Sequence, residues 1–506
     1  MTGSAWVVLP LTCLVGGAFA VYLVARLLTS RNDLLALLTA LTFVMALVTL
    51  VPLQVMAGEG HLPAWGHFGP GGALLCADPG AVVVAGMASG LGLLVSLYSG
   101  CYLSLDRRYE TYYPLLLLLV TGLTGMVLAT DLFNIYMFCE LMSAAAYVLV
   151  AFRRHTDTAI EAGFKYLVMG GVGTVTILLG ISFVYRERGQ LMLAQVMGAP
   201  GPWTRAGLAC FLVGLGIKSA IVPLHTWLPD AHGRAPSSIS AMLSGVVIQS
   251  TFYTLLKVCL GLGWSGRNLG TLLIALALLN MTLGNGMALV QTNTKRLLAY
   301  STIAQMGYIM LSVGIGLRYN VLVAIQAGFF MMLAHAIMKG LAFLCKGVCH
   351  FYYDATTISQ LQGTAAQMPL VAVTFGIALA GLAGVPPLAG FTGKWFVMIG
   401  TLRSSDILGY VGLVVFLLNS LLSLGYYLPL IGTLFSPRTQ GGRGERIRIS
   451  PWMVVPLLIM GVLVLVVGLY PGPWMEWVEG AGVYLLSVGT ESFGYAQTAP
   501  AHGLGR

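Results

Sequence analysis

Charge is scarce in this chain: only 8% of its 506 residues are Asp, Glu, Lys or Arg, whereas a soluble domain carries about 25%. Acidic residues are rarer than basic ones, at 17 against 26, and hydrophobic residues make up 58% of the chain. This composition excludes a large soluble domain, because so few charged side chains could not cover its surface. The net charge of +9 comes from arginines in loops and does not indicate binding to nucleic acid.

The sequence also lacks clusters of cysteines and motifs that could bind a nucleotide. The eight cysteines fall mostly inside apolar runs, where cysteine packs as a small hydrophobic residue. The segment Cys345–His350 has the pattern C-x3-C-H, one residue longer than the motif of covalent haem attachment. The glycines of Gly170–Gly173 lie inside an apolar run, where no phosphate-binding loop can form. We therefore predict no metal and no cofactor in this chain, so any redox chemistry would belong to other proteins.

Apolar runs of helical length are abundant. Because a helix of about 20 apolar residues crosses the hydrocarbon core of a bilayer, we predict an all-α polytopic membrane protein with about 14 transmembrane helices. The predicted spans lie near residues 6–28, 33–56, 81–104, 113–130, 132–152, 161–184, 206–223, 239–262, 270–291, 296–316, 321–348, 369–402, 408–436 and 451–471. The first run has no basic leader and no small-residue cleavage site, so we interpret it as a retained span.

Two of these runs, the seventh and the twelfth, are expected to be broken helices. In the seventh, Pro223 follows Lys218 by five residues and removes a backbone donor from the helix. The twelfth, 369–402, is too long for one straight span and contains Pro386 and Pro387. A break at this depth frees amide and carbonyl groups, which is tolerated only against protein or a water-lined cavity. The two breaks therefore indicate a polar path through the membrane.

The ionisable residues inside the predicted spans are few. Glu140 is the one carboxylate near the centre of a span. Lys218, Lys339 and Lys394 lie too deep for snorkelling to explain them easily. A charge at the bilayer centre costs roughly 2.5–3.5 kcal/mol on insertion scales, so each needs a partner, water or a function. A poorly solvated lysine can exist in either protonation state, so a switchable pair with Glu140 would take up and release protons. The alternative is a buried ion pair that only holds helices together.

Three further polar residues are candidates for a proton relay: His225, Gln249 and His335. His335 is the one histidine well inside a span and shares a helix face with Lys339, four residues later. A hydrogen bond between helices would explain His335 equally well. Gln249 lies in the middle of the eighth span, and His225 follows the first helix break. Lys257 lies close to a span end, where snorkelling to the membrane surface is the simpler explanation.

The positions of the breaks suggest an internal repeat. Residues 113–262 and 270–436 each hold five predicted spans with one broken helix, and an odd number of spans inverts the second unit relative to the first. Inverted repeats with discontinuous helices are a recurring design of transporters. We divide the chain into 1–112, with the first three spans, the two five-helix repeats, and 437–506, with a cytoplasmic loop, the last span and a polar tail.

Lysine and arginine are unevenly distributed between the loops. Counting residues at span ends, the loops after odd-numbered spans carry 14 of them and the loops after even-numbered spans carry six. The positive-inside rule then places the odd loops, among them Arg107–Arg108 and Arg438–Arg448, in the cytoplasm and both termini outside. We expect a multi-pass protein of the cell's inner (plasma) membrane.

Several motifs in these spans resemble a known family. They are F-C-E-L-M-S at Phe138–Ser143, K-x4-P-L-H-x-W-L-P-D-A-H at Lys218–His232, A-P-S at Ala235–Ser237, T-K-R-L-L-A-Y-S-T-I-A-Q-M-G-Y at Thr294–Tyr308, H-A-x2-K-x-L-x-F at His335–Phe343 and P-P-L-A-G-F-x-G-K at Pro386–Lys394. On these residues, from about Pro114 to Tyr427, the chain resembles the proton-conducting antiporter-like subunits. That family is shared by respiratory complex I, Mrp-type Na⁺/H⁺ antiporters and membrane-bound hydrogenases.

The resemblance implies two inverted five-helix repeats, each a proton half-channel, joined by a central hydrophilic axis. The family's pumping residues map onto Glu140, Lys218, Lys339 and Lys394, with His335 and His225 assisting. Many relatives carry a lysine where this chain has Gln249. Because glutamine cannot change charge, the link between the half-channels would rest on water, His335 and Lys339.

Three functions are compatible with the sequence. We favour a subunit that translocates H⁺, or H⁺ and Na⁺, in a complex such as NADH-quinone oxidoreductase, with other membrane subunits and the lipid bilayer as partners. The corresponding component of an Mrp-type antiporter or of a membrane-bound hydrogenase is the alternative, and the chain would be an enzyme only as part of a complex. A self-sufficient secondary transporter would need a solute pocket that the sequence does not offer. A haem subunit would need axial ligands inside spans, and one mid-span histidine cannot supply two such ligands. Binding of a quinone is not excluded by this count.

Overall fold

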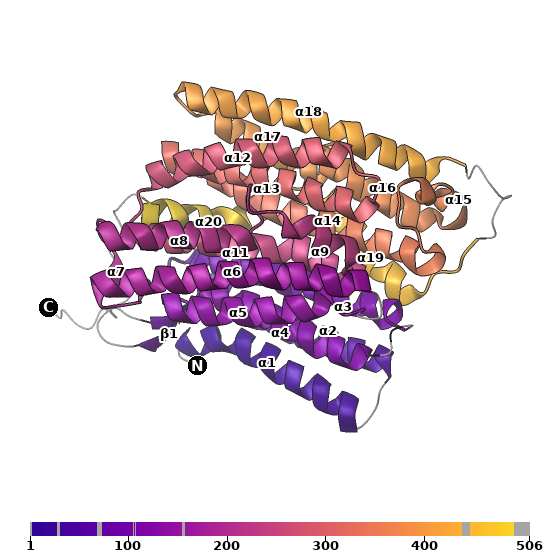
Figure 1. Ribbon diagram of the computed structural model, residues 1–506, viewed down its shortest axis with the longest axis horizontal. Coiled ribbons are helices and arrows are strands. Elements are labelled where there is room, and N and C mark those ends of the chain that lie inside the picture. The colour runs from indigo at the N-terminus through magenta and orange to yellow at the C-terminus, as the bar shows by residue number, and fades with distance from the viewer. Residues whose placement is uncertain are drawn as a thin grey trace.

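The computed structural model describes residues 3–27, 31–67, 73–104, 106, 108–153, 157–437 and 446–489. Apart from one two-stranded hairpin and a few isolated bridges, the regular structure of the described chain is helical, which confirms the all-α class. The long helices lie side by side along the longest axis of the molecule (Figure 1). Arg107, Arg154, Arg438 and Arg443, on which part of the orientation prediction rests, fall outside the described residues.

The helices before the first break are α1 Gly3–Leu27, α2 Asn32–Gly58, α3 Pro79–Tyr102, α4 Tyr109–Leu128, α5 Leu132–Val150, α6 Asp157–Arg188, the single turn α7 Leu193–Val196 and α8 Pro202–Lys218. The next are α9 Trp227–Arg234, α10 Ser237–Met242, a π-helical turn Leu243–Val247, α11 Ile248–Gly261, α12 Gly266–Leu289, α13 Thr294–Tyr319 and α14 Leu322–Tyr353. The last are α15 Thr364–Gln367, α16 Pro369–Ala383, α17 Ala389–Leu402, α18 Ile407–Phe435, α19 Pro451–Leu469 and α20 Gly472–Gly489.

Twelve helices in the described ranges are long and apolar enough to cross a membrane, with α10, the π-helical turn and α11 counted as one. The seventh and twelfth predicted spans are absent from these twelve because a break leaves only shorter helices there. The seventh corresponds to α8, with α9 following beyond the break, and the twelfth is divided into α16 and α17. The predicted total of about 14 therefore depends on counting α8 as one span and α16 with α17 as another.

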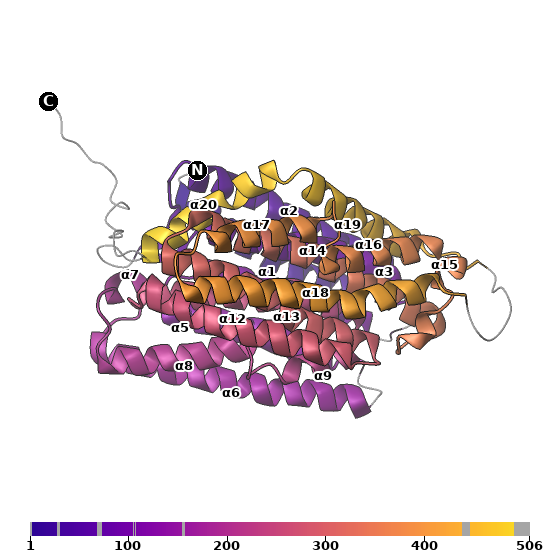
Figure 2. The same ribbon diagram turned by 90° about the horizontal axis from the view of Figure 1, so that it is seen from above.

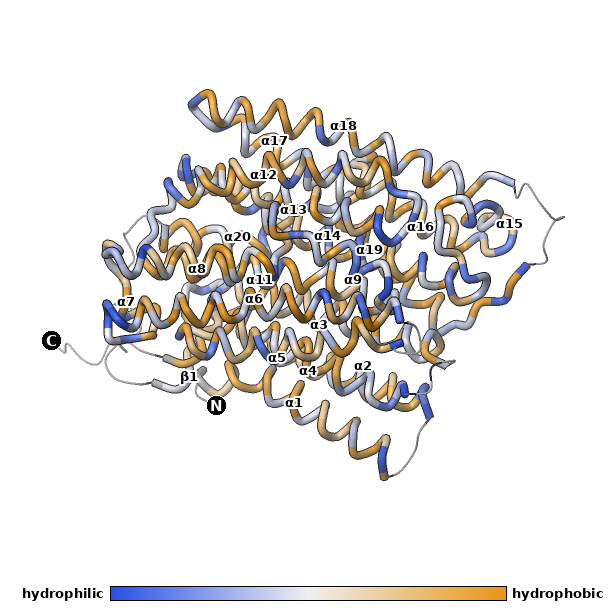
Figure 3. Tube along the Cα trace, in the orientation of Figure 1, coloured by the Kyte–Doolittle hydropathy of each residue, from blue (hydrophilic) through white to orange (hydrophobic). Residues whose placement is uncertain are grey.

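The centre of the bundle is formed by α11, α13 and α14, whose residues are buried on nearly all sides. Outer helices such as α1, α6 and α18 instead expose large apolar side chains, among them Phe19, Val175 and Leu421. Apolar side chains on the outside suit contact with lipid, whereas the buried central helices are shielded from lipid by their neighbours. Most hydrophilic residues lie near the two ends of the helices (Figure 3). The protein is therefore a multi-pass membrane protein.

Both predicted helix breaks are present. Residues 219–226 separate α8 from α9, and residues 384–388 separate α16 from α17. Ala220 has φ of 52° and Gly384 has φ of 92°, left-handed conformations that a right-handed helix cannot contain and that disfavour a residue with a side chain. In both views, α8 and α17 occupy one half of the molecule's length, and α9 and α16 occupy the other (Figures 1 and 2). The two broken helices therefore run in opposite directions, as inverted repeats require, and the repeat boundaries stay a prediction.

Two elements were not expected from the hydropathy pattern. The strands β1 Ala64–His67 and β2 Ala73–Cys76 form an antiparallel hairpin in the loop before α3. After α19 the chain continues as α20, which packs on α3 and α14. Glu476 and Glu479 lie within α20 and weaken its apolar signal, which explains why no further helix was predicted after α19. The start of α1 and the end of α20 lie at the same end of the bundle (Figure 1).

Candidate functional site

The predicted pair of Glu140 and Lys218 is present where the first break begins. Lys218 is the last residue of α8, and its Nζ lies 3.6 Å from Glu140 Oε1 on α5. The same amine donates a hydrogen bond of 2.6 Å to Ser143 Oγ, one turn further along α5. Thr174 of α6 donates its hydroxyl hydrogen to Glu140 Oε1. Three helices thus hold one carboxylate and one amine together at the break.

Buried amide side chains satisfy the backbone at both breaks. Val222 N, inside the first break, donates to Asn280 Oδ1 of α12 at 2.9 Å. Gln305 of α13 donates from Nε2 to Leu382 O, in the last turn of α16, at 3.0 Å. A buried backbone group without a partner costs about 1–3 kcal/mol, so these amides stabilise the broken geometry. Neither residue was predicted, because one amide inside a span does not reveal which distant backbone group it serves.

Two relay candidates, Gln249 and His335, meet at the centre of the bundle. Gln249 Nε2, on α11, lies 2.6 Å from His335 Nδ1 on α14 and donates to Met332 O at 3.0 Å. The bond to Met332 O fixes the amide nitrogen on this side, and an amide nitrogen only donates. His335 Nδ1 therefore accepts, which leaves the proton of the neutral ring on Nε2.

Lys339 lies one turn beyond His335 on α14 and is fully buried. Its Nζ donates to Leu298 O at 2.8 Å and to the hydroxyl of Ser301, both on α13. None of the ion pairs within the described ranges includes Lys339 or Lys394. Neutral oxygens hold these amines, so nothing fixes either of them in the charged form as a carboxylate would.

Lys394 lies beside the second break, in the helix that follows it. Its Nζ, on α17, donates to Ala383 O at 2.9 Å, a carbonyl at the end of α16 that has no helical partner. The same amine lies 5.2 Å from the ring centroid of Tyr308 on α13. Tyr308 shares one face of α13 with Gln305 and Ser301, at helical spacing. This face of α13 connects Lys339 with Lys394.

Several buried polar atoms along this path have no hydrogen-bond partner among the described residues. They include Gln249 Oε1, Ser250 Oγ, His335 Nε2 and both ring nitrogens of His232. Buried polar groups are normally paired with protein or with ordered water, so these atoms are candidate contacts for water molecules. No side-chain hydrogen bond in the described part of the chain joins Lys218 directly to Gln249.

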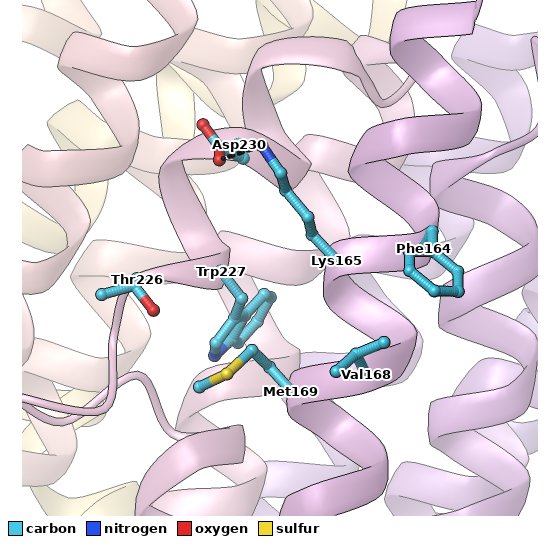
Figure 4. A pocket seen from close by; sticks show the side chains of 7 residues that line it. All are labelled: Phe164, Lys165, Val168, Met169, Thr226, Trp227 and Asp230. Carbon is cyan, nitrogen blue, oxygen red and sulfur yellow. Dashed lines mark hydrogen bonds and ion pairs between the residues drawn. The ribbon is translucent and has the colours of Figure 1, made fainter.

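His225 lies in the first break, half-buried, with its ring centroid 6.5 Å from that of Tyr300. Beside the break a pocket of about 270 Å³ opens between α6 and α9, where Lys165 reaches across to Asp230 (Figure 4). Trp227 lines this pocket and donates from Nε1 to Ile217 O at 2.7 Å, directly before Lys218. One indole ring therefore connects the pocket wall to the end of α8.

A second pocket, of about 370 Å³ and strongly charged, adjoins the first. Its wall includes Glu161, Lys165, Asp230 and Arg296, joined by ion pairs of 2.7 to 3.6 Å. These charges are half-exposed, so each pair contributes little to stability. The two pockets lie at the end of the bundle predicted to face the cytoplasm.

The prediction that Lys257 snorkels to the membrane surface is wrong. Lys257 is 5% exposed, and its Nζ lies 2.9 Å from Oδ2 of the fully buried Asp78. It also donates to Val127 O at 2.9 Å. Position within a span could not reveal this pair, because Asp78 stands 179 residues earlier in the chain, at the start of α3.

Within the described ranges, no group of three or more His, Cys, Asp or Glu side chains is placed to hold a metal ion. A membrane bundle with two opposed broken helices and a buried row of lysine, histidine and amide groups is the architecture of ion-translocating membrane proteins. Residues 129–423 match the family described as NADH:quinone oxidoreductase/Mrp antiporter, transmembrane. The chain belongs to this family.

Among its relatives, NADH-quinone oxidoreductase subunit N of Desulforudis audaxviator is 32% identical over 79% of this chain and 83% of its own length. The F(420)H(2) dehydrogenase subunit N of Methanosarcina mazei is 31% identical over 78% and 82%. Two solved structures are also similar, each at 28% identity. A chain of the archaeal membrane-bound sulfane sulfur reductase has a TM-score of 0.86, covering 98% of this chain and 99% of its own. A chain of respiratory complex I from Thermus thermophilus has a TM-score of 0.75, covering 92% and 98%.

Proposed function

We propose that this chain is a proton-translocating subunit of a multisubunit complex in the cell's inner (plasma) membrane. The observation that carries the proposal is the buried row of amines, in which Lys218 faces a carboxylate while Lys339 and Lys394 face only neutral oxygens. A lysine held by neutral oxygens in a poorly solvated place can gain or lose its proton at modest cost. Such a row can pass protons, because no carboxylate holds Lys339 or Lys394 permanently in the charged form.

In this proposal each residue has a distinct role. Glu140 and Lys218 act as the switch of the first half-channel, because the carboxylate stabilises the charged amine only while the two stay close. Gln249, His335 and Lys339 join the half-channels at the centre, with water at their unpartnered atoms. Lys394 serves as the terminal carrier, beside the second break. The repeats 113–262 and 270–436 are then the two half-channels.

The named relatives favour a redox-driven complex of the NADH-quinone oxidoreductase type over an Mrp-type antiporter. Both named relatives are N subunits, one of an NADH-quinone oxidoreductase and one of an F(420)H(2) dehydrogenase, at identities above 30%. A chain of the Mrp complex from Dietzia has a TM-score of 0.84 over 98% of this chain and 100% of its own, but at 24% identity this likeness concerns the fold alone. We propose H⁺ as the translocated ion, with Na⁺ as the alternative.

The test uses the assembled complex, isolated through a tag on this chain and studied in sealed membrane vesicles. Lys218→Met should abolish proton translocation while the complex still assembles. Lys165→Met, which removes a half-exposed lysine at the surface pocket, should translocate at the parental rate and serves as the control. Parental translocation by Lys218→Met would overturn the proposal. Net solute uptake by the purified chain alone would support a secondary transporter instead.

A further inference from the structure

A second buried group of acid and base side chains lies at the end of the bundle that carries the β1–β2 hairpin. It consists of Asp78, Tyr253 and Lys257, and we name it the hairpin-end cluster. Lys257 Nζ contacts Asp78 Oδ2 at 2.9 Å, and the Tyr253 hydroxyl donates to Asp78 Oδ1. Asp78 and Tyr253 are fully buried, and Lys257 nearly so. None of the roles assigned above uses these three residues.

The cluster joins three helices through more contacts than an ion pair alone would make. Asp78 Oδ1 also accepts from Ala81 N at 2.8 Å and so caps the start of α3, while Lys257 donates to Val127 O at the end of α4. A buried ion pair often adds little net stability, because desolvation of the two charges offsets their attraction. Apolar side chains would hold these helices equally well, so the contact of acid, phenol and amine points to proton chemistry.

Helix α11 connects the cluster with the centre of the bundle. Gln249, Tyr253 and Lys257 follow one another at intervals of four residues, so they lie along one side of α11, each step advancing about 6 Å. Helix α14 packs against this side of α11. His335 contacts Gln249, and Phe329 packs edge-on against Tyr253 with ring centroids 5.9 Å apart. A polar line therefore runs from the Gln249–His335 contact to the hairpin end.

We propose that the hairpin-end cluster is a proton-exchange site through which protons pass between the Gln249–His335 centre and the membrane face that carries the hairpin. The inference rests on the proposed translocation function and adds a route to it. The orientation prediction places the hairpin outside, so this face would be the one that receives the translocated proton.

The exchange step conserves protons and needs no other reactant. At rest the amine of Lys257 is protonated and faces the carboxylate of Asp78. Tyr253 passes its hydroxyl proton to that carboxylate and takes a replacement proton from the side of the centre. Loss of one proton from the cluster to the aqueous face then restores the resting pair. The other titratable groups near the cluster are the buried Cys76 of β2, two residues before Asp78, and the exposed Glu476 and Glu479 of the neighbouring α20.

The decisive variant is Tyr253→Phe in the assembled complex, because it removes the relaying hydroxyl and leaves the ion pair and the ring packing in place. Translocation is measured in sealed vesicles while the pH on the hairpin side is varied and the other side is held constant. We expect at least a fivefold loss of rate and a displaced dependence on hairpin-side pH, with normal assembly. A structural role alone would leave that dependence unchanged. Asp78→Asn, which can still cap α3, should lose translocation more completely.

The matched control is Asp406→Asn, which breaks the ion pair between Arg318 and Asp406 at the same end of the bundle. Arginine does not release its proton, so this variant should keep the parental rate and pH dependence. If Tyr253→Phe also keeps the parental rate and the parental pH dependence, the proposed exchange site is wrong. This holds even when Asp78→Asn fails to assemble. Lys218→Met measured in parallel separates the two proposals: its normal translocation would overturn the proposed function itself.

Discussion

Lys218 and Glu140 lie 3.6 Å apart, yet the lysine side chain is 4% exposed and the glutamate side chain 38%. The carboxylate is thus partly accessible from outside the protein, whereas the amine is enclosed by it. An ion pair with one open member can change its environment when a neighbour covers or uncovers the carboxylate. This asymmetry suits a proton switch better than an ion pair that only holds helices together.

Lys218→Arg distinguishes the two roles of this pair. Arginine keeps the positive charge next to Glu140 but does not release its proton near neutral pH. We therefore expect proton translocation to fall at least tenfold in vesicles while the complex still assembles. Glu140→Gln, which removes the favourable charge instead, should also translocate poorly. An arginine variant that translocates at the parental rate would leave only the structural role.

Gln249→Leu tests the contact at the centre of the bundle. The substitution leaves His335 Nδ1 and Met332 O without the amide that donates to both, so the ring loses its fixed orientation. We expect slower translocation with assembly retained. Thr251→Val, two residues further along α11, removes a hydroxyl that donates to Val247 O of its own helix, and this control should have a much smaller effect. Equal rates for the two variants would remove Gln249 from the path.

Asn280→Leu should destabilise the first helix break. Val222 N would lose its acceptor inside the bundle, at a cost of about 1–3 kcal/mol. Thermal unfolding of the purified complex should therefore begin at a lower temperature. Leu279→Ala, at an exposed position beside Asn280 on the same helix, should leave the unfolding temperature nearly unchanged. A variant at Asn280 as stable as the parent would show that the break does not depend on this hydrogen bond.

Asp406, which caps the start of α18, should make stability depend on acidic pH. Hydrogen bonds from Arg318 and Tyr319 hold the pKa of this carboxyl below its usual range. A pKa depressed by folding adds stability that is complete above about pH 4 and is lost as pH falls through the lower value in the folded state. Asp406→Asn should therefore lower the unfolding temperature at pH 7, and the difference from the parent should shrink under acid. A constant difference across this range would contradict the assignment.

The predicted orientation rests on the asymmetry of arginine and lysine in the loops. Single cysteines placed at Arg108 and Arg448, in a background without other cysteines, should resist an impermeant thiol reagent added to intact cells. A cysteine at Arg267, in an even-numbered loop, should react. Labelling of the first two from outside would reverse the topology and the predicted direction of the hairpin-end route.

Composition and local pattern determined the class of this protein because they depend only on neighbouring residues. The bundle could be predicted because the chain has too little charge for a soluble surface and has apolar runs of membrane length. Its two breaks could be predicted from Pro223 and Pro386 inside such runs. The unusual depth of Lys218, Lys339 and Lys394 likewise follows from the cost of charge in a bilayer.

Only the tertiary structure decided which groups meet. The contact of Gln249 with His335, the bond from Val222 to Asn280 and the pair of Asp78 with Lys257 each join residues 58 to 179 positions apart. Helix packing sets such distances, and the polarity of one residue does not indicate which residue on another helix is its partner. For that reason Lys257 looked like a snorkelling lysine in the sequence, and the fold shows a buried ion pair.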